Sequence, residues 1–354
     1  MTDQLVAAGP LVCPAPYVTS ERVQLGHGSG GKMSAALLRE RFLPHFANPA
    51  LLRLGDGAVV PVGPCEIVVS TDTFVVSPLE FPGGNIGSLA VHGTVNDVAM
   101  MGARPLYLTA GFVLEEGLPF ELLDRIVRSM GESAAAAGVS LVAGDTKVVE
   151  RGKADGLFIN TTGIGLLTRE FSPAPDRARP GDAIVLSGPI GRHGMAIMAV
   201  REGIAFETRI ESDSASLLPL VDRLREALGS DVHVLRDPTR GGVASTLNEI
   251  AAASGVGIEL EEAAIPVPSD VSAACEMLGL DPLYVANEGV LVALFPDSLT
   301  GAALASLRGH PMGAAAVRVG KVVAGHPGLV VLRTAIGGSR IVDQLPGDQL
   351  PRIC

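Results

Sequence analysis

The chain has 354 residues, of which 47% are hydrophobic and 4% aromatic, and it carries a formal net charge of −11 at pH 7. This composition excludes a wholly disordered protein, and the length suits two domains of about 100–200 residues each. The acidic balance argues against nucleic acid as a partner. No apolar run reaches the roughly 18 residues of a membrane-spanning helix, and no signal peptide opens the chain, so we expect a cytoplasmic protein with no membrane contact.

The first half of the chain alternates predicted strands and helices. A glycine cluster, Gly26-His27-Gly28-Ser29-Gly30-Gly31-Lys32, precedes a helical stretch that runs to about Phe42. Apolar runs around 59–60 and 67–69 predict buried strands. Helical spacing then covers 86–101, and the later segments predict a strand over 106–114, a helix over 120–137, and strands over 139–143 and 157–167.

A proline-rich stretch over 172–181 indicates a domain boundary, and mixed strands and helices resume after it. We divide the chain into an N-terminal segment with a glycine-rich lid (1–50), a first domain (51–170), a second domain (171–335) and a flexible tail (336–354). Both domains mix strands and helices, which indicates an α+β or mixed α/β fold.

The glycine cluster admits two interpretations. Gly26, Gly28 and Gly31 fit GxGxxG, but no clear strand precedes them. Gly26, Gly31 and Lys32 also fit the start of a Walker A phosphate-binding pattern, but Met33 stands where a magnesium-binding Ser or Thr is required. A flexible turn before a helix explains the cluster as well as a lid does. As a lid, the amides of Gly28 and Gly31 and the amine of Lys32 would approach phosphate oxygens.

Five aspartates lie at positions where each carboxylate has either a local structural role or a role in binding a cation. They are Asp56, Asp72, Asp97, Asp145 and Asp237. Each one alone is explained by a cap or a turn, although Asp97 lies in a small-residue, apolar helical segment where a carboxylate requires a partner. Gathered in one place, such acids would repel one another unless a divalent cation such as magnesium held them together.

Asp237-Pro238-Thr239-Arg240-Gly241-Gly242 predicts a helix start. Asp237 or Thr239 would cap the helix, and the amides with Arg240 would receive an anion. Lys147 follows Asp145 by two and would share its face of a strand. Glu288 precedes an apolar strand, and it would act as a base only if a closed pocket raised its pKa.

The four cysteines, at positions 13, 65, 275 and 354, show no CxxC spacing, which argues against a disulfide framework or an all-cysteine zinc site. Cys354 is the last residue of the chain. A 19-residue tail from Ile336 would reach roughly 60 Å when extended, so Cys354 is either a thiol on a swinging arm or an incidental cysteine at a frayed end.

These segments together resemble the HypE family, the carbamoyl dehydratases of [NiFe]-hydrogenase maturation. The motifs that carry the resemblance are Ser70-Thr71-Asp72-Thr73, His92-Gly93-Thr94-Val95-Asn96-Asp97, Gly144-Asp145-Thr146-Lys147, Asp237 to Gly242, and the closing Pro351-Arg352-Ile353-Cys354. The aspartate motifs are shared with aminoimidazole ribonucleotide synthetase, selenophosphate synthetase and thiamine-monophosphate kinase. The glycine loop lacks the reactive cysteine of selenophosphate synthetase.

The resemblance implies a two-domain, aminoimidazole ribonucleotide synthetase-like α+β fold whose N-terminal domains build a β-barrel across a homodimer. It implies ATP and Mg²⁺ as cofactors, a HypF-like carbamoyltransferase that loads Cys354, and a HypC–HypD-like complex that takes the product. The implied metal ligands are Asp56, Asp72, Asp97 and Asp237. The implied nucleotide-binding residues are Gly28, Gly31, Lys32, Asp145, Thr146, Thr239, Arg240 and Gly241.

The implied reaction is the ATP-dependent dehydration of an S-carbamoyl group on Cys354 to an S-cyano group. We assign Glu288 as the candidate base and Lys147 as the candidate residue that orients the carbamoyl group. Two other hypotheses remain: another small-molecule synthetase or kinase of the same superfamily, and a non-catalytic scaffold on which Cys354 only carries a ligand.

Overall fold

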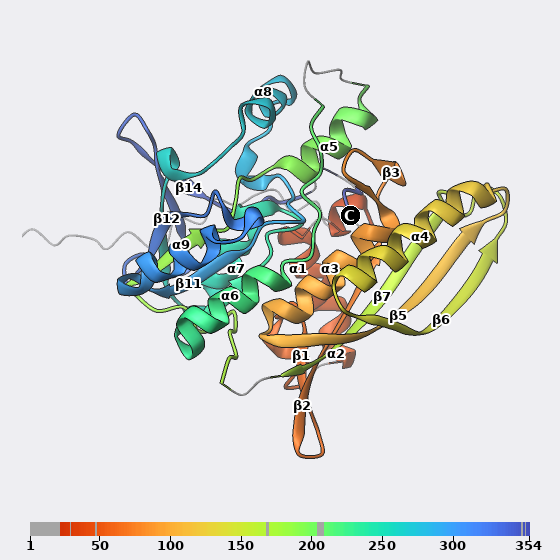
Figure 1. The fold of residues 1–354 in the computed structure, drawn as a ribbon. Helices are drawn as coiled ribbons and strands as arrows, with labels where there is room; N and C mark the ends of the chain where they lie inside the picture. The colour runs from red at the N-terminus through yellow and green to blue at the C-terminus, as the bar shows by residue number, and fades with distance from the viewer. Residues whose placement is uncertain are drawn as a thin grey trace, which may run out of the picture.

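A computed structural model describes residues 22–28, 30–46, 48–167, 170–203, 209–347, 350 and 352–354. Two sheets dominate it, one drawn from residues 58–167 and the other from residues 182–342 (Figure 1). A two-stranded ribbon of β3 (Glu80–Phe81) and β4 (Gly84–Asn85) stands beside the first sheet. Strands and helices are mixed in both halves, as the sequence predicts.

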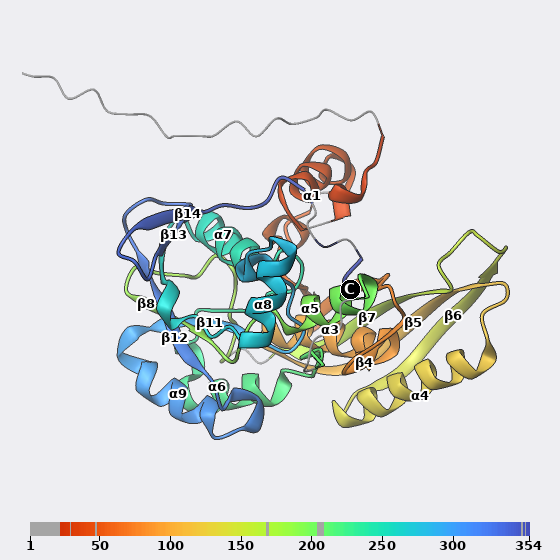
Figure 2. The same ribbon diagram turned by 90° about the horizontal axis from the view of Figure 1, so that it is seen from above.

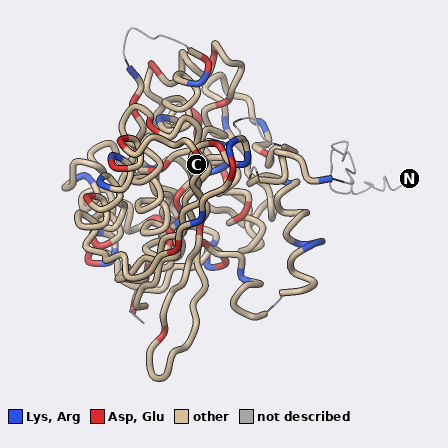
Figure 3. The backbone as a smooth tube through the Cα atoms, turned by 90° about the vertical axis from the view of Figure 1, so that its right-hand side faces the viewer, with Lys and Arg blue, Asp and Glu red and all other residues tan. Residues whose placement is uncertain are grey.

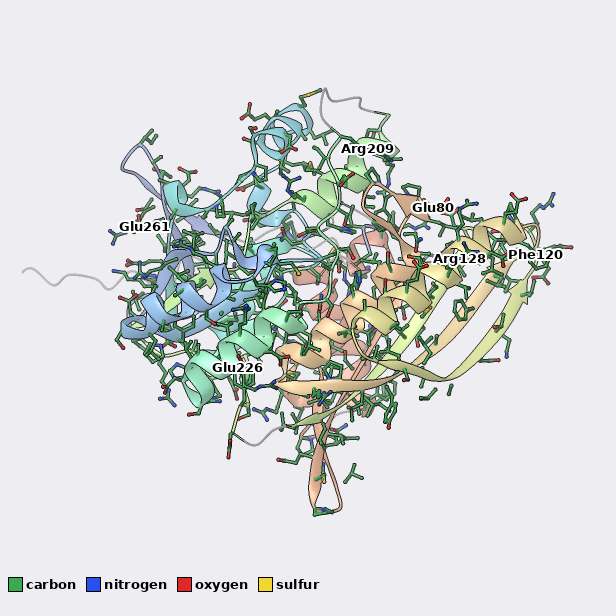
Figure 4. The ribbon with its side chains drawn as sticks, in the orientation of Figure 1. Glu80, Phe120, Arg128, Arg209, Glu226 and Glu261 are labelled. Carbon is green, nitrogen blue, oxygen red and sulfur yellow. The ribbon has the colours of Figure 1, made fainter. Side chains whose placement is uncertain are left out.

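The first sheet has five strands in the order β1-β2-β7-β5-β6. Their bounds are Ala58–Val62, Cys65–Phe74, Leu157–Leu167, Ala103–Glu115 and Ser140–Val149. β5 and β6 run parallel, because α4 (Phe120–Ala136) carries the chain back between them. α3 (Ile86–Met100) and α4 pack against one face of this sheet, and Glu80 of β3 reaches toward α4, where its Oε2 lies 2.8 Å from Nη2 of Arg125 (Figure 4).

Two glycines on β7 decide how closely α3 approaches the sheet. A Cβ on Gly165 would lie 2.4 Å from Cγ1 of Val98, and a Cβ on Gly163 would lie 2.8 Å from Cγ2 of Thr94. Both Val98 and Thr94 are fully buried residues of α3. The small residues that alternate along 157–167 therefore serve the helix contact, which places Asp97 of α3 close to the sheet.

The other face of the first sheet has no helix over it in the described residues. Exposed apolar side chains on this face include Tyr107 and Leu166, which alternate along their strands with buried residues. β6 is an edge strand on which nine of ten residues are exposed. The β1–β2 hairpin projects from the body with few charges, at the bottom of Figure 3. Phe120, 81% exposed, stands at the outer end of α4 (Figure 4).

The second sheet has seven strands in the order β14-β13-β10-β12-β8-β11-β9. Their bounds are Ser339–Val342, Val330–Arg333, Gly257–Glu261, Val317–Val323, Asp182–Leu186, Val292–Pro296 and Val234–Arg236. Five helices accompany it (Figure 2): α5 (Arg192–Arg201), α6 (Leu218–Leu228), α7 (Gly242–Ser254), α8 (Ser269–Leu278) and α9 (Thr300–Arg308). Apolar side chains of α7 pack on one face of this sheet and those of α6 and α9 on the other.

Three elements differ from the sequence prediction. β6 extends to Val149, so Asp145 lies inside a strand and not at its end. The N-cap of α7 is Gly241 with φ 75°, and no side chain caps it, so the prediction of a cap at Asp237 or Thr239 was wrong. The predicted tail begins at Ile336, but ordered structure continues to β14, because Val342 is buried against the sheet.

The lid sequence lies mostly within the described residues. A 3₁₀ turn, η1 (Leu25–Gly28), is followed by α1 (Lys32–Leu37), a π-helical segment η2 (Leu38–Phe42) and α2 (Leu43–Phe46). Ser29, Pro351 and the first 21 residues, with Cys13, lie outside the described residues. Across the part of the chain that the structure covers, no helix combines the length and apolar character needed to cross a membrane.

The close approach of α3 to β7 gives a stability prediction. Gly165→Ala should destabilise the protein by about 1–3 kcal/mol, because the added methyl overlaps Val98. Thermal unfolding followed by circular dichroism would measure the change. Gly131→Ala is the control: Gly131 lies in α4 with nothing within 4 Å of an added Cβ, so this substitution should stabilise by about 0.5–1 kcal/mol. Equal effects at both positions would contradict the packing argument.

Candidate functional site

Three aspartates from distant parts of the chain converge. Asp56 precedes β1, Asp97 lies on α3 and Asp237 follows β9. One carboxylate oxygen from each lies within 4.8 Å of the others. The cluster thus joins the first sheet, its helix and the end of a strand of the second sheet. This arrangement brings together three of the four predicted metal ligands.

Burial and mutual repulsion make this cluster hard to ionise. Desolvation, with the neighbouring carboxylates adding to it, raises the pKa of Asp97 well above its ordinary value. Desolvation also raises the pKa of Asp56 to about 8 and that of Asp237 to about 6, although Arg236 opposes both shifts. Oδ2 of Asp56 is buried without a hydrogen-bond partner. A hard divalent cation, which takes carboxylate oxygens, suits this donor set.

Ser70 and Arg236, which were not predicted as site residues, also contact the cluster. Ser70 donates its hydroxyl toward Oδ2 of Asp97 at 2.6 Å and lies 2.7 Å from the carbonyl oxygen of Asp56. Nε of Arg236 lies 2.7 Å from Oδ1 of Asp56, and its Nη2 donates to Glu249 at 2.8 Å. Ser70 opens the motif Ser70-Thr71-Asp72-Thr73, and Arg236 directly precedes Asp237, so both positions gave a signal in the sequence.

Asp72 stands near the cluster without joining the three converging oxygens. It lies on β2, half-buried, and its Oδ1 accepts the backbone N–H of Thr73 at 2.8 Å. Desolvation raises its pKa, while Arg240 lowers it. Its charge in turn raises the pKa of Asp97. Asp72 therefore interacts electrostatically with both Asp97 of the cluster and Arg240.

A pocket beside the cluster collects residues from both ends of the chain. Gly28, Gly31, Arg240, Gly241 and Cys354 line it together. Nη1 of Arg240 donates to the carbonyl oxygen of Gly28 at 3.0 Å, which ties the lid to the turn before α7. Negative charge at Cys354 raises the pKa of Arg240. Glycine backbone, a cation and a thiol thus share one cavity.

Lys32 and Thr239 lie at the rim of this arrangement. Nζ of Lys32 is 2.5 Å from Oδ2 of Asp343, and its backbone N–H donates to Leu345 at 3.0 Å. The start of the tail therefore lies against the lid. The backbone N–H of Thr239 donates to the carbonyl oxygen of Asp237 at 2.9 Å, which forms the turn that carries Arg240.

Glu288 is buried, which decides between the two interpretations of its sequence position. Its side chain is 2% exposed. Desolvation raises its pKa well above the ordinary value, with Asp237, Asp72 and Asp213 adding to the shift. Oδ1 of Asp213 accepts the Glu288 backbone N–H at 3.2 Å. A buried glutamate whose pKa is raised is a stronger base than an exposed one.

Asp145, Thr146 and Lys147 lie apart from this centre. They are exposed on β6, where Nζ of Lys147 is 2.5 Å from Oδ2 of Asp145. Asp145 Oδ1 accepts the backbone N–H of Thr146 at 2.9 Å. Two strands, β7 and β5, separate β6 from β2 and Asp72. Strands lie about 4.8 Å apart, so these residues stand roughly 14 Å from β2 across the sheet of one chain.

The chain matches two family models that together cover most of its length. The first is AIR synthase related protein, N-terminal domain, over residues 54–167, and the second is AIR synthase related protein, C-terminal domain, over residues 179–332. A carbamoyl dehydratase HypE from Cupriavidus necator is 55% identical over 339 residues, which cover 95% of this chain and 96% of the relative. The Escherichia coli K12 carbamoyl dehydratase HypE is 45% identical, over 94% and 99% of the two chains.

Solved structures of similar proteins have the same fold. A chain from a HypE–HypF complex is 48% identical with a TM-score of 0.83, and the match covers 88% of this chain and all of that one. A hydrogenase maturation protein HypE in complex with ATP is 52% identical with a TM-score of 0.79, over 93% of this chain and 98% of that one. These matches confirm the predicted fold class.

The acidic cluster gives a prediction with a definite sign. The raised pKa values mean that the folded state binds more protons than the unfolded state between about pH 4 and pH 8. In a chelator, stability should therefore fall as pH rises through that window. Added Mg²⁺ should reduce this loss and raise Tm at pH 8 by at least about 2 °C, equivalent to roughly 1 kcal/mol.

Asp97→Asn separates this explanation from general salt effects. The variant removes one buried charge, so its Tm in chelator should depend less on pH, and the response to Mg²⁺ should disappear. Differential scanning calorimetry at pH 5 and pH 8 would measure both. A response to Mg²⁺ that survives the substitution would mean that the cation binds elsewhere.

Proposed function

The chain belongs to the HypE family of carbamoyl dehydratases, and we propose on this premise that it uses ATP to dehydrate an S-carbamoyl group on Cys354 to an S-cyano group. The cyano group would supply the cyanide ligands of the [NiFe]-hydrogenase iron centre. The observation that carries this proposal is the position of Cys354, which lines one pocket with Arg240 and the lid glycines, beside the acidic cluster. A terminal thiol in a nucleotide-type pocket suits chemistry on a group that the chain itself carries.

The reaction needs a leaving group that the carbamoyl oxygen does not supply. Transfer of the γ-phosphoryl group of ATP to that oxygen releases ADP and converts the oxygen into phosphate, which departs readily. Loss of the two nitrogen protons and expulsion of phosphate then leave S–C≡N. Asp56, Asp97 and Asp237 would hold Mg²⁺, with Asp72 beside them, and the ion would offset the phosphate charge.

Other residues of the chain would bind the phosphates, take up protons and exclude water. Gly28, Gly31, Arg240, Gly241 and Thr239 would receive the phosphates, with Lys32 released from Asp343. Glu288 would take protons from the carbamoyl nitrogen, since burial beside the acids makes its carboxylate a strong base. Ile353 is 3% exposed, so the docked tail plugs the pocket and keeps water from the activated intermediate.

A second copy of the chain would complete the site. The uncovered face of the first sheet and the exposed edge β6 suit a sheet-to-sheet contact that closes a barrel across a homodimer. Asp145, Thr146 and Lys147, remote from their own chain's cluster, would then face the partner's pocket. There Asp145 and Thr146 would bind the nucleotide and Lys147 would orient the carbamoyl group.

The remaining expectations belong to the same proposal. A HypF-like carbamoyltransferase would load Cys354, in keeping with the HypE–HypF complex of a relative, and a HypC–HypD-like complex would accept the cyano group. The division at about residue 170 between a nucleotide-binding, dimerising domain and a second domain also stays a prediction. The cytoplasmic location and the lack of a nucleic-acid partner also stay predictions.

Intact mass tests the proposed reaction directly. After carbamoylation by its partner enzyme, the protein should lose the mass of one water when Mg-ATP is added, at the peptide that ends in Cys354. Cys354→Ala should take up no carbamoyl group. Glu288→Gln should be carbamoylated normally and dehydrated at least roughly a hundredfold more slowly, because general base catalysis contributes factors of this size. A carbamoyl adduct that survives Mg-ATP would favour a carrier role.

Mixed dimers test whether Lys147 acts across the interface. Lys147→Ala and Cys354→Ala homodimers should both be inactive. If Lys147 serves the partner's pocket, co-expressed heterodimers regain one complete site, with the thiol from one subunit and the amine from the other, and should show about half the activity per dimer. Single-turnover dehydration of affinity-purified heterodimers would measure it. Heterodimers as inactive as their parents would place Lys147 in its own chain's site.

A further inference from the structure

The docked tail is held by its backbone, and the holding groups come from both halves of the chain. A C-terminal carboxylate oxygen of Cys354 accepts the N–H of Val75 at 3.0 Å, and the carbonyl oxygen of Arg352 accepts the N–H of Ser77 at 3.3 Å. The carbonyl oxygen of Ile353 lies 2.9 Å from Nε2 of His193. The main-chain oxygens of the last three residues therefore all have donors, from the segment after β2 on one side and α5 on the other.

Arg201, the last residue of α5, joins these two sides. Its Nη2 donates to the carbonyl oxygen of Arg352 at 2.8 Å and to that of Ser77 at 2.6 Å, and its Nε is 3.2 Å from the same Ser77 oxygen. One guanidinium thus bridges a tail carbonyl and a carbonyl of the segment that receives the tail. Hydrogen bonds to a charged donor are stronger than neutral ones, so this bridge is a strong tie on the tail backbone.

His193 is built to donate to the tail as a neutral ring. It is fully buried, its Nδ1 lies 2.8 Å from Oγ of Ser212, and its ring meets Phe81 edge-on with centroids 5.5 Å apart. A carbonyl only accepts, so Nε2 carries the hydrogen and Nδ1 accepts from the Ser212 hydroxyl. Burial lowers the pKa of His193 to about 4, so this donor keeps its neutral form near pH 7.

The side chain of Arg352 is also occupied when the tail is docked. Its Nη1 lies 2.6 Å from Oδ2 of Asp155, and its Nε donates to the carbonyl oxygen of Val75 at 3.0 Å. A protease that requires the Arg352 side chain must therefore wait for the tail to leave. The contacts of Arg201 and His193, by contrast, are to main-chain atoms, so they do not depend on what the Cys354 sulfur carries.

We propose that Arg201 and His193 are positioning residues that clamp the tail backbone and thereby hold the group on Cys354 in the pocket. Neither residue is among those that line the pocket. Their loss should leave nucleotide binding intact and lower the fraction of time that the tail is docked. The docking part of this inference is independent of the reaction, and its link to turnover rests on the proposed function.

Trypsin provides a direct measure of tail docking in the full-length protein. Cleavage after Arg352 releases the dipeptide Ile353-Cys354, and mass spectrometry of the intact protein records the loss. Because the docked Arg352 side chain is engaged, the rate of release follows the undocked fraction when docking is fast. Cleavage after Arg151, in an exposed turn, is the internal measure of general loosening.

Arg201→Ala should release the dipeptide roughly tenfold faster than the unmodified protein, with cleavage after Arg151 unchanged. Arg201→Lys, which keeps a cation but not the bridge, should fall between the two. Arg192→Ala is the matched control, since Arg192 begins the same helix and faces Asp270 at 3.9 Å. His193→Gln, which keeps a donor, should release the dipeptide more slowly than His193→Ala.

The same variants test whether docking of the tail affects the rate of dehydration. Single-turnover dehydration of carbamoylated Arg201→Ala should slow about tenfold, while the Kd for ATP stays unchanged. Release of the dipeptide from Arg201→Ala at the rate of the unmodified protein would overturn the clamp. Faster cleavage at both sites would make Arg201 a residue of general stability and not of positioning. Faster release with unchanged dehydration would overturn the link to turnover. If the unmodified protein performs no dehydration, the proposed function fails, and dipeptide release still decides the clamp.

Discussion

The arrangement of this protein depends on the burial of like charges. Asp56, Asp97 and Asp237 bring carboxylate oxygens within 4.8 Å of one another at the place where the two halves of the chain meet. Such a cluster costs free energy unless a cation compensates it, and the nearby guanidinium of Arg236 offsets only part of the charge. In the proposed function, a bound cation and the phosphates of ATP would compensate this cost. The glycines of β7, which let α3 lie close to the sheet, set the depth of Asp97 in this cluster.

The tail, by contrast with the buried acidic cluster, is held by favourable contacts that each contribute little. Its ties are mainly hydrogen bonds from fixed donors to its main-chain oxygens, with the Arg352–Asp155 ion pair and one buried side chain, Ile353. Each such bond contributes little in net terms, so docking is readily reversed, which a carrier arm requires. The Lys32–Asp343 ion pair adds a contact between the lid and the start of the tail, 60% exposed on the Asp343 side, where solvent screens it. Lid and tail thus meet over the pocket without locking it.

One chain alone does not assemble the predicted site. Asp145, Thr146 and Lys147 stand on an edge strand whose apolar neighbours are exposed, two strands away from β2. An uncovered sheet face with an exposed edge usually meets another sheet, and a symmetric partner would bring these residues to the opposite pocket. In this proposal the dimer is therefore required for catalysis and not only for stability.

The sequence by itself determined the elements and most of the chemistry. Helical spacing and apolar runs predicted α3, α4, β5 and β7 within a few residues, because these periodicities are local. The motifs around Asp97, Asp237 and Cys354 indicated the family. Only the tertiary structure decided that Asp56, Asp97 and Asp237 converge while Asp72 stands aside, and that Glu288 is buried. It also decided that Ser70 and Arg236 contact the cluster and that His193 and Arg201 contact the tail. Burial and convergence depend on contacts between residues far apart in the chain, and such contacts leave no local pattern.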